Sequence, residues 1–190
     1  MNNLKKGFTL IELLIVIAIL AVLSVAVVLA LNPAELLKQA RDSTRVSDMA
    51  AVNKAIALYL EDVPAPGIGG TANAACPATL TTRCTYSTTT SPFTTGVCGT
   101  ISTSTAVNGT GWVSIDFTQI SAGNPISSLP VDPVNSASYL YAYGCNALGY
   151  KMGTVMESNK YSNPTTGYMR NSYDGGINNG WYEVGNNLAL

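Results

Sequence analysis

The stretch KKGFTLIELLIVIAILAVL, residues 5–23, decides how the rest of the chain is organised. Two lysines and a glycine lead into a long apolar run, which continues to Leu31 and carries a single carboxylate, Glu12, near its start. The run from Phe8 to Leu31 holds 24 residues, and an α-helix of that length spans about 36 Å, more than the roughly 30 Å hydrocarbon core of a bilayer. The pattern therefore predicts a membrane-spanning helix.

The flanking residues predict the orientation of this helix. Basic residues beside a first span resist translocation, so Lys5 and Lys6 keep the start of the chain cytoplasmic and the remainder faces outward. The alternative is an ordinary secretory signal that is cut after the small residues 24–26. Glu12 argues against that alternative, because a carboxylate inside an apolar segment costs about 3 kcal/mol on insertion scales and needs a partner.

The residues around the glycine resemble a known processing site. Lys5-Lys6-Gly7 followed by Phe8-Thr9-Leu10-Ile11-Glu12 is similar to the N-terminal motif of type IV pilins and pseudopilins. The resemblance implies that a prepilin peptidase cuts between Gly7 and Phe8 and methylates the new amino terminus, and that Glu12 is the assembly carboxylate. Phe8 and Glu12 are four apart, so we expect them to share a helix face, and the Phe8 amine of a neighbouring subunit can neutralise Glu12.

The composition argues against an enzyme. The chain of 190 residues leaves room for one soluble domain of roughly 125 residues. Its net charge is −1, and no basic patch suggests a nucleic-acid partner. A minor DNA-binding role stays an alternative. The absence of histidine removes the Ser-His-Asp and Cys-His arrangements and the commonest zinc sites. No phosphate-binding loop is present, and we expect no cofactor; a Ser-Lys or paired-carboxylate site is the remaining alternative.

The chain has four cysteines, all on the predicted outward side, which favours two disulfides. They are Cys76, Cys84, Cys98 and Cys145. A metal site of four cysteines is the rival, but there is no Cys-x-x-Cys pair. We prefer a pairing of Cys76 with Cys84 and of Cys98 with Cys145, although three pairings are open to four cysteines.

Beyond the span, residues 33–62 show helical periodicity, with an apolar row from Met49 to Val63 that seeks a core. Asn32 is a candidate N-cap before Pro33. The first half of this helix is more polar, and its charges predict either a solvated face or a contact between packed subunits. The charged residues concerned are Lys38, Arg41, Asp42, Arg45 and Asp48.

The remainder of the chain predicts a loop and then a small sheet. Residues 64–111 are rich in Thr, Ser, Gly and Ala and predict a surface segment pinned by disulfides. Residues 112–117 alternate, as in a strand or a short transition, and residues 139–156 predict a hairpin that packs on the apolar row of the helix. The tail from residue 174 to residue 184 predicts an oxygen-rich loop and a short strand.

Calcium is a weak possibility in these loops, because carboxylate and amide oxygens are its preferred ligands. The candidates are Asp132, Asn135, Asp174 and Asn178, and ordinary turn chemistry is the alternative for all of them.

The sequence therefore predicts a pilin-like α+β fold, with a long N-terminal helix packed on a small antiparallel sheet. The expected parts are a leader (1–7), a membrane and assembly helix (8–31), an amphipathic helix (32–63), a disulfide-bearing loop (64–111) and the sheet with its C-terminal loops (112–190).

The resemblance implies a structural subunit that polymerises with identical copies into an extracellular filament. Its expected partners are the prepilin peptidase, an inner-membrane assembly platform and, before assembly, the membrane itself. The alternatives are a major pseudopilin of a type II secretion system and a membrane-anchored extracellular binding module.

Overall fold

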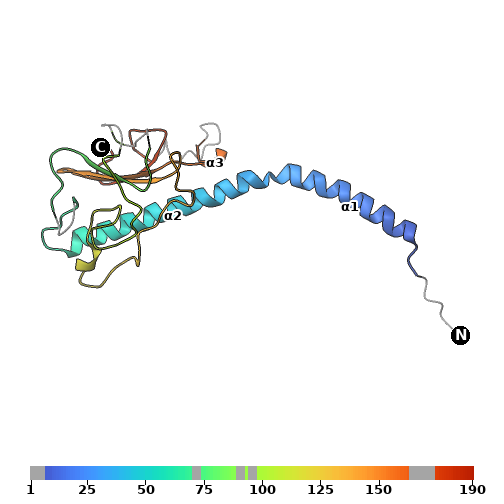
Figure 1. Cartoon of the computed structure of the whole chain (residues 1–190), viewed down its shortest axis with the longest axis horizontal. Helices are drawn as coiled ribbons and strands as arrows, with labels where there is room; N and C mark the ends of the chain where they lie inside the picture. The colour runs from blue at the N-terminus through green and yellow to red at the C-terminus, as the bar shows by residue number, and fades with distance from the viewer. Residues whose placement is uncertain (1–6, 70–73, 89–92, 94–97, 163–173) are drawn as a thin grey trace. The chain divides into compact units, whose positions relative to one another are not determined.

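The computed structural model describes residues 7–69, 74–88, 93, 98–162 and 174–190. The chain divides into two compact units, Met1–Leu37 and Lys38–Leu190, and we call the second unit the head. The first unit contains helix α1 and the start of helix α2. The head contains the rest of α2 and all the strands found among the described residues (Figure 1).

Helix α1 (Leu10–Leu31) is the apolar helix that the sequence predicted. Every described side chain between Phe8 and Val28 is exposed, and all of them except Thr9, Glu12 and Ser24 are apolar. Its one hydroxyl, on Ser24, donates to the Leu20 carbonyl oxygen at 2.7 Å and is thereby satisfied inside the helix. Leu10–Val28 has a mean hydropathy of 3.1 and is long and apolar enough to cross a membrane.

Helix α2 (Pro33–Asp62) begins as the sequence predicted. Asn32 ends α1 in a left-handed conformation with φ 41°, and it also opens α2, because its carbonyl oxygen and side-chain oxygen accept the Glu35 N–H at 3.0 and 3.4 Å. Pro33 fits the first helical position, where no backbone N–H is needed. The helix ends at Asp62, shortly before Pro64.

The head contains one five-stranded sheet in the order β2-β1-β3-β4-β5. All neighbouring strands run antiparallel except β1 and β2, which are parallel. The strands are β1 (Thr81–Cys84), β2 (Thr100–Ile101), β3 (Tyr141–Asn146), β4 (Gly149–Thr154) and β5 (Tyr182–Gly185), and two short helices accompany them, η2 (Phe117–Gln119) and α3 (Asn159–Ser162). This architecture confirms the predicted pilin-like α+β fold and the hairpin of β3 and β4.

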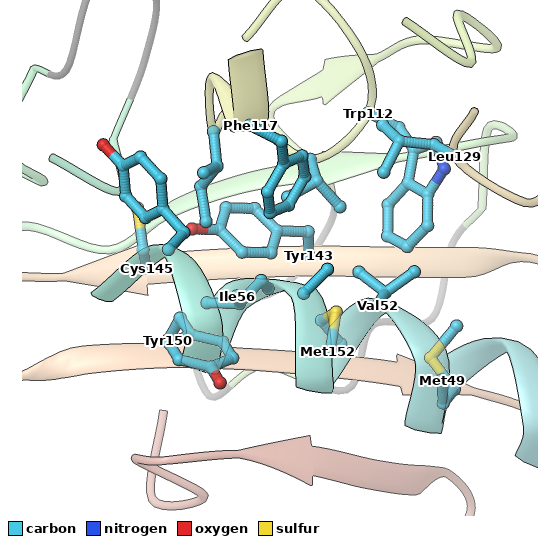
Figure 2. Close-up of a cluster of buried hydrophobic side chains, with 14 of the residues drawn as sticks. Met49, Val52, Ile56, Trp112, Phe117, Leu129, Tyr143, Cys145, Tyr150 and Met152 are labelled. Carbon is cyan, nitrogen blue, oxygen red and sulfur yellow. The ribbon is translucent and has the colours of Figure 1, made fainter. Parts of the chain in front are cut away.

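The main core lies between α2 and one face of the sheet (Figure 2). Met49, Val52 and Ile56 are fully buried, and they meet the alternate side chains of β3 and β4 that point the same way. Those side chains are Tyr141, Tyr143, Cys145, Tyr150 and Met152. The predicted packing of the hairpin on the apolar row of α2 is therefore confirmed.

Residues 112–117 close this core from a third side. Trp112, Ile115 and Phe117 are fully buried, but the segment forms no named strand; it makes an isolated bridge between Asn108 and Asp116 and then enters η2. Of the two predicted readings, strand or transition, the structure shows a transition. Strands β1 and β2 lie within residues 64–111, for which the sequence predicted a surface segment, and β1 is ordered by backbone pairing with β3.

The opposite face of the sheet carries a smaller cluster, formed by Cys84, Phe93, Leu140, Ala142, Trp181 and Leu190. Beside it, Lys151 of β4 and Glu183 of β5 form an ion pair at 2.7 Å, and neither side chain is exposed. The Lys151 ammonium also lies 5.5 Å from the centre of the Phe93 ring. The sheet is thus covered on both faces.

Two disulfides are present, as predicted, but the preferred pairing was wrong. The bonds join Cys76 to Cys145 and Cys84 to Cys98. The reason is the strand register: Cys145 points into the main core together with Cys76, whereas Cys84 points into the cluster on the opposite face, against which Cys98 packs. Successive side chains of a strand alternate between faces, so each disulfide forms on its own side of the sheet.

Candidate functional site

The start of α1 forms a compact polar site at the edge of the apolar helix. Thr9 is the N-cap, and its hydroxyl oxygen accepts the Glu12 backbone N–H at 3.3 Å. In return, Glu12 Oε2 accepts the Thr9 backbone N–H at 2.8 Å and the Thr9 hydroxyl at 2.7 Å. This capping box satisfies backbone groups that the first turn of any helix leaves without partners.

Gly7 and Phe8 lie just before this box, outside the helix. Phe8 is 83 % exposed, and a Cβ placed on Gly7 would meet no atom within 4 Å. The predicted sharing of a helix face by Phe8 and Glu12 is wrong, because α1 begins only at Leu10 and Thr9 has extended torsions, φ −82° and ψ 152°. The bond between Gly7 and Phe8 is therefore in an open, non-helical segment.

A second polar site, which differs from the prediction made from the sequence, lies in the head. The predicted charged face of α2 would be solvated or would contact another subunit, yet Arg45 and Asp42 have no exposed side-chain surface. Arg45 binds Asp42 at 2.7 Å and Asp132 at 2.6 Å, and it lies 5.0 Å from the centre of the Tyr139 ring. The expectation is wrong for these two charges, because loops of the head supply partners for them.

The partners come from the ends of the hairpin. Asp42 accepts the backbone N–H of Glu157 at 2.9 Å and both the N–H and the hydroxyl of Ser158 at 2.7 and 2.6 Å. Glu157 in turn binds Arg41 through two hydrogen bonds at 2.7 and 2.5 Å. The cluster therefore attaches the polar half of α2 to the segment that follows β4.

The charged groups of this cluster shift one another's pKa values. Burial alone would lower the pKa of Arg45, but the hydrogen bonds and charges of Asp132 and Asp42 together raise it above its ordinary value. The hydrogen bond from Arg41 lowers the pKa of Glu157, and the charge of Arg45 acts in the same direction. Burial raises the pKa of the neighbouring Asp48, whose carboxylate accepts the Tyr141 hydroxyl at 2.7 Å. Arg45, Arg41 and Glu157 thus stay charged at neutral pH.

The weak calcium candidates have other partners. Asp132 is bound to Arg45 and also accepts the Val134 N–H at 2.8 Å, whereas Asp174 accepts the N–H groups of Gly176 and Glu183 at 2.8 and 2.6 Å. Among the described residues, no group of three or more His, Cys, Asp or Glu side chains could hold a metal ion. The structure places Asp132 and Asp174 in separate hydrogen-bond systems.

A shallow open depression of about 320 Å³ lies beside the tip of the hairpin. It is lined by Leu60, Pro66, Ile68, Ala75, Cys76, Asn146, Ala147, Leu148 and Gly149. None of these side chains can act as an acid or a base, since the cysteine is bonded to Cys145. This depression offers no catalytic chemistry.

An exposed apolar helix followed in the chain by a pilin-like α+β head is the arrangement of a prepilin-like protein, and it is consistent with a membrane anchor. In agreement, residues 2–28 match the family model described as the prokaryotic N-terminal methylation motif, which is typical of type IV pilins and pseudopilins. No curated protein and no solved structure matches the chain. The resemblance noted from the sequence is thereby confirmed, and proteins of this kind are in general structural rather than enzymatic.

Proposed function

We propose that this chain is the structural subunit of a type IV pilus-like filament. The observation that carries the proposal is the placement of Glu12: a carboxylate stands in the first turn of a helix whose other side chains are almost all apolar and exposed. A lone anchor has no use for that carboxylate, because it weakens insertion. A polymer has a use for it, because the amine of a second subunit can neutralise it.

The proposed sequence of events starts in the membrane. The chain inserts with its N-terminus in the cytoplasm and its head outside, and a prepilin peptidase cuts after Gly7 and methylates Phe8. The processed subunit waits in the bilayer through α1 and is then extracted by an inner-membrane assembly platform. In the filament, the α1 helices of identical subunits pack against one another instead of against lipid. The exposed apolar surface of α1 then becomes the interior of the filament.

The cross-links within the head support this proposal. Two disulfides and the ion-pair cluster of Arg45 join parts of the head to one another, and the core clusters of the head are built from residues between Met49 and Leu190. A subunit that leaves the membrane for an extracellular filament needs a head that stays folded when its anchor changes surroundings. The oxidised cysteines fit the expected outward location of the head.

Two alternative functions are compatible with part of these observations. A major pseudopilin of a type II secretion system would share the motif and the helix but would form a short fibre below the cell surface. A membrane-anchored binding module would need α1 only as an anchor, and it would keep its N-terminal residues or lose the segment up to Ala26.

Replacement of Glu12 tests the proposal. Glu12→Ala removes the carboxylate without disturbing the apolar length of α1, so we expect normal insertion and cleavage but loss of filaments in electron micrographs of cells. Glu61→Ala is the matched control, since Glu61 is an exposed carboxylate on α2 far outside the span. Normal filaments with Glu12→Ala would contradict the proposed role of Glu12. In cells with the unmodified protein, long surface filaments would favour the pilus over the pseudopilus.

A further inference from the structure

One sequence motif of the head has no part in the proposed function. Asn108-Gly109-Thr110 has the pattern Asn-x-Ser/Thr, in which the asparagine amide accepts an N-linked sugar and x is any residue but proline. The other match to Asn-x-Ser/Thr in the chain, Asn163-Pro164-Thr165, has proline at the excluded position and lies outside the described residues. Asn108 is therefore the single acceptor of this kind that the sequence offers.

The structure places this motif on an exposed turn of the head. Asn108 and Thr110 are exposed, and Gly109 between them has φ 84°, in the left-handed region that glycine adopts without strain. A backbone hydrogen bond of 2.8 Å from Phe117, which is fully buried, to the Val107 carbonyl oxygen holds the turn on the core. An enzyme can thus reach the motif while the head is folded.

The hydrogen bonds of the turn fix the orientation of the Asn108 amide group. Asn108 Oδ1 accepts the Thr110 N–H at 3.3 Å and the Thr110 hydroxyl at 2.7 Å. A backbone N–H can only donate, so the atom that faces it is the oxygen and not the nitrogen of the amide. Within the described part of the chain, no hydrogen bond involves Nδ2 of Asn108. The amide nitrogen is therefore left for a partner from outside the chain.

The Thr110 hydroxyl also prepares this amide for reaction. An amide nitrogen is a weak nucleophile, because its lone pair is delocalised into the carbonyl group. The hydrogen bond from the hydroxyl draws electron density toward Oδ1 of Asn108, which makes the Nδ2–H bonds more acidic. Loss of a proton is then easier when the nitrogen forms a new bond. The hydroxyl reaches Oδ1 because the turn at Gly109 folds the chain back on itself.

We propose that Asn108 is an N-glycosylation site, and that its substrate is a sugar activated as a diphosphate ester. In the reaction, Nδ2 bonds to the anomeric carbon, the bond from that carbon to the diphosphate oxygen breaks, and the diphosphate leaves with the electron pair. The proton passes from Nδ2 to a base on the transferase. The inference goes beyond the proposed function and requires an accessible head, not a filament.

Mass spectrometry of peptides from the protein of its native cells tests the site, with electron-transfer fragmentation to assign an added mass to one residue. We expect a glycan on Asn108 in the wild-type protein and in Thr110→Ser. We expect its loss in Asn108→Gln and in Thr110→Val, which nearly keeps the volume of threonine but has no hydroxyl. An unchanged disulfide map checks that each head has folded. An unmodified Asn108 in the wild type, or a glycan that survives Thr110→Val, would overturn the inference.

A spontaneous reaction of the Asn-Gly pair is the rival source of an altered mass. The Gly109 nitrogen attacks the side-chain carbonyl carbon of Asn108, ammonia leaves, and water opens the ring to give an acid. Asn179-Gly180 is the matched control, because it is an exposed Asn-Gly pair that is followed by Trp181 in place of a hydroxyl residue. The small mass change of this reaction at both pairs, with no sugar on Asn108, would overturn the proposal. A glycan on Asn108 and none on Asn179 supports it.

A block of protein export distinguishes two sources of the activated sugar. A lipid-linked sugar on the outer face of the membrane modifies exported chains alone, whereas a nucleotide-linked sugar in the cytoplasm also modifies chains whose export is blocked. Both results support Asn108 as the site and differ in the carrier.

The variant Glu12→Ala separates this inference from the proposed function. Its membrane-held protein should keep the glycan on Asn108, although we expect it to form no filaments. If wild-type filaments carry an unmodified Asn108, the glycosylation site is overturned and the proposed function stands. If Glu12→Ala forms normal filaments and carries the glycan, the proposed function fails and the site stands.

Discussion

Arg45 and Asp132, which are 87 residues apart in the sequence, form a two-point ion pair inside the head. Arg45 donates through Nε to Oδ2 at 2.6 Å and through its second terminal nitrogen to Oδ1 at 3.0 Å, and neither side chain is exposed. The pair joins α2 to the loop that precedes β3, and it does so with the planar geometry that only a guanidinium offers to a carboxylate.

Removal of one partner should destabilise the head strongly. Asp132→Ala leaves the Arg45 charge buried with an incomplete set of partners, and loss of one side of a buried pair typically costs about 3–5 kcal/mol in the free energy of unfolding. The measurement is denaturant unfolding of the full chain in detergent, followed by near-ultraviolet circular dichroism. Asp62→Ala is the control, because Asp62 is only partly buried and its hydrogen bonds are to the neutral Ser121, so its effect should be clearly smaller. Equal effects of the two substitutions would show that the ion pair is not a main support of the head.

The head should lose stability in acid through Glu157. The hydrogen bond from Arg41 lowers the pKa of Glu157 in the folded head below its ordinary value of 4.5. The stabilisation is therefore complete above pH 4.5 and is lost as the pH falls through the lower, folded pKa. Glu157→Gln should be less stable than wild type at neutral pH, and the difference in the free energy of unfolding should shrink below pH 4.5.

The comparison with Glu157→Gln isolates this group from its neighbours. Burial raises the pKa of Asp48, which contributes with the opposite sign, but Asp48 is present in both proteins and cancels in the difference. A difference that stayed constant from neutral pH into strong acid would contradict the assigned ion pair of Glu157 and Arg41.

The two disulfides should contribute unequally. The Cys76–Cys145 bond spans 69 residues and the Cys84–Cys98 bond spans 14, so loop-closure entropy predicts stabilisation of about 4 and about 3 kcal/mol. Replacement of Cys76 and Cys145 by serine should therefore lower the midpoint of unfolding more than replacement of Cys84 and Cys98. Peptide mapping without reduction checks the pairing itself, and a peptide that linked Cys76 to Cys84 would contradict the structure.

Most of the fold could be predicted because its local signals agree with its packing. The apolar run up to Leu31, the Asn32-Pro33 helix start and the alternating strands of the hairpin each specify one element, and all three formed where predicted. The disulfide pairing could not be predicted, because it depends on which face of the sheet each cysteine occupies, and that is set by pairing between β1 and β3.

The polar sites also depend on partners that lie far apart in the sequence, which local patterns do not reveal. Asp42 and Arg45 continue the spacing of three and four that runs through Met49 and Val52, and that continuation was the signal that they would be buried. Their partner Asp132 lies far along the chain and carries no local sign of its role. At the start of α1, the pattern Thr9-x-x-Glu12 is a recognisable capping box, and it would have indicated that Phe8 lies outside the helix.

Mass spectrometry of the processed N-terminus tests the central claim most directly. If the chain is a filament subunit of the proposed kind, the protein recovered from membranes or filaments begins at Phe8 and carries one methyl group on its terminal nitrogen. A chain that still begins at Met1, or one that begins at Val27 after removal of a signal peptide, would contradict the account.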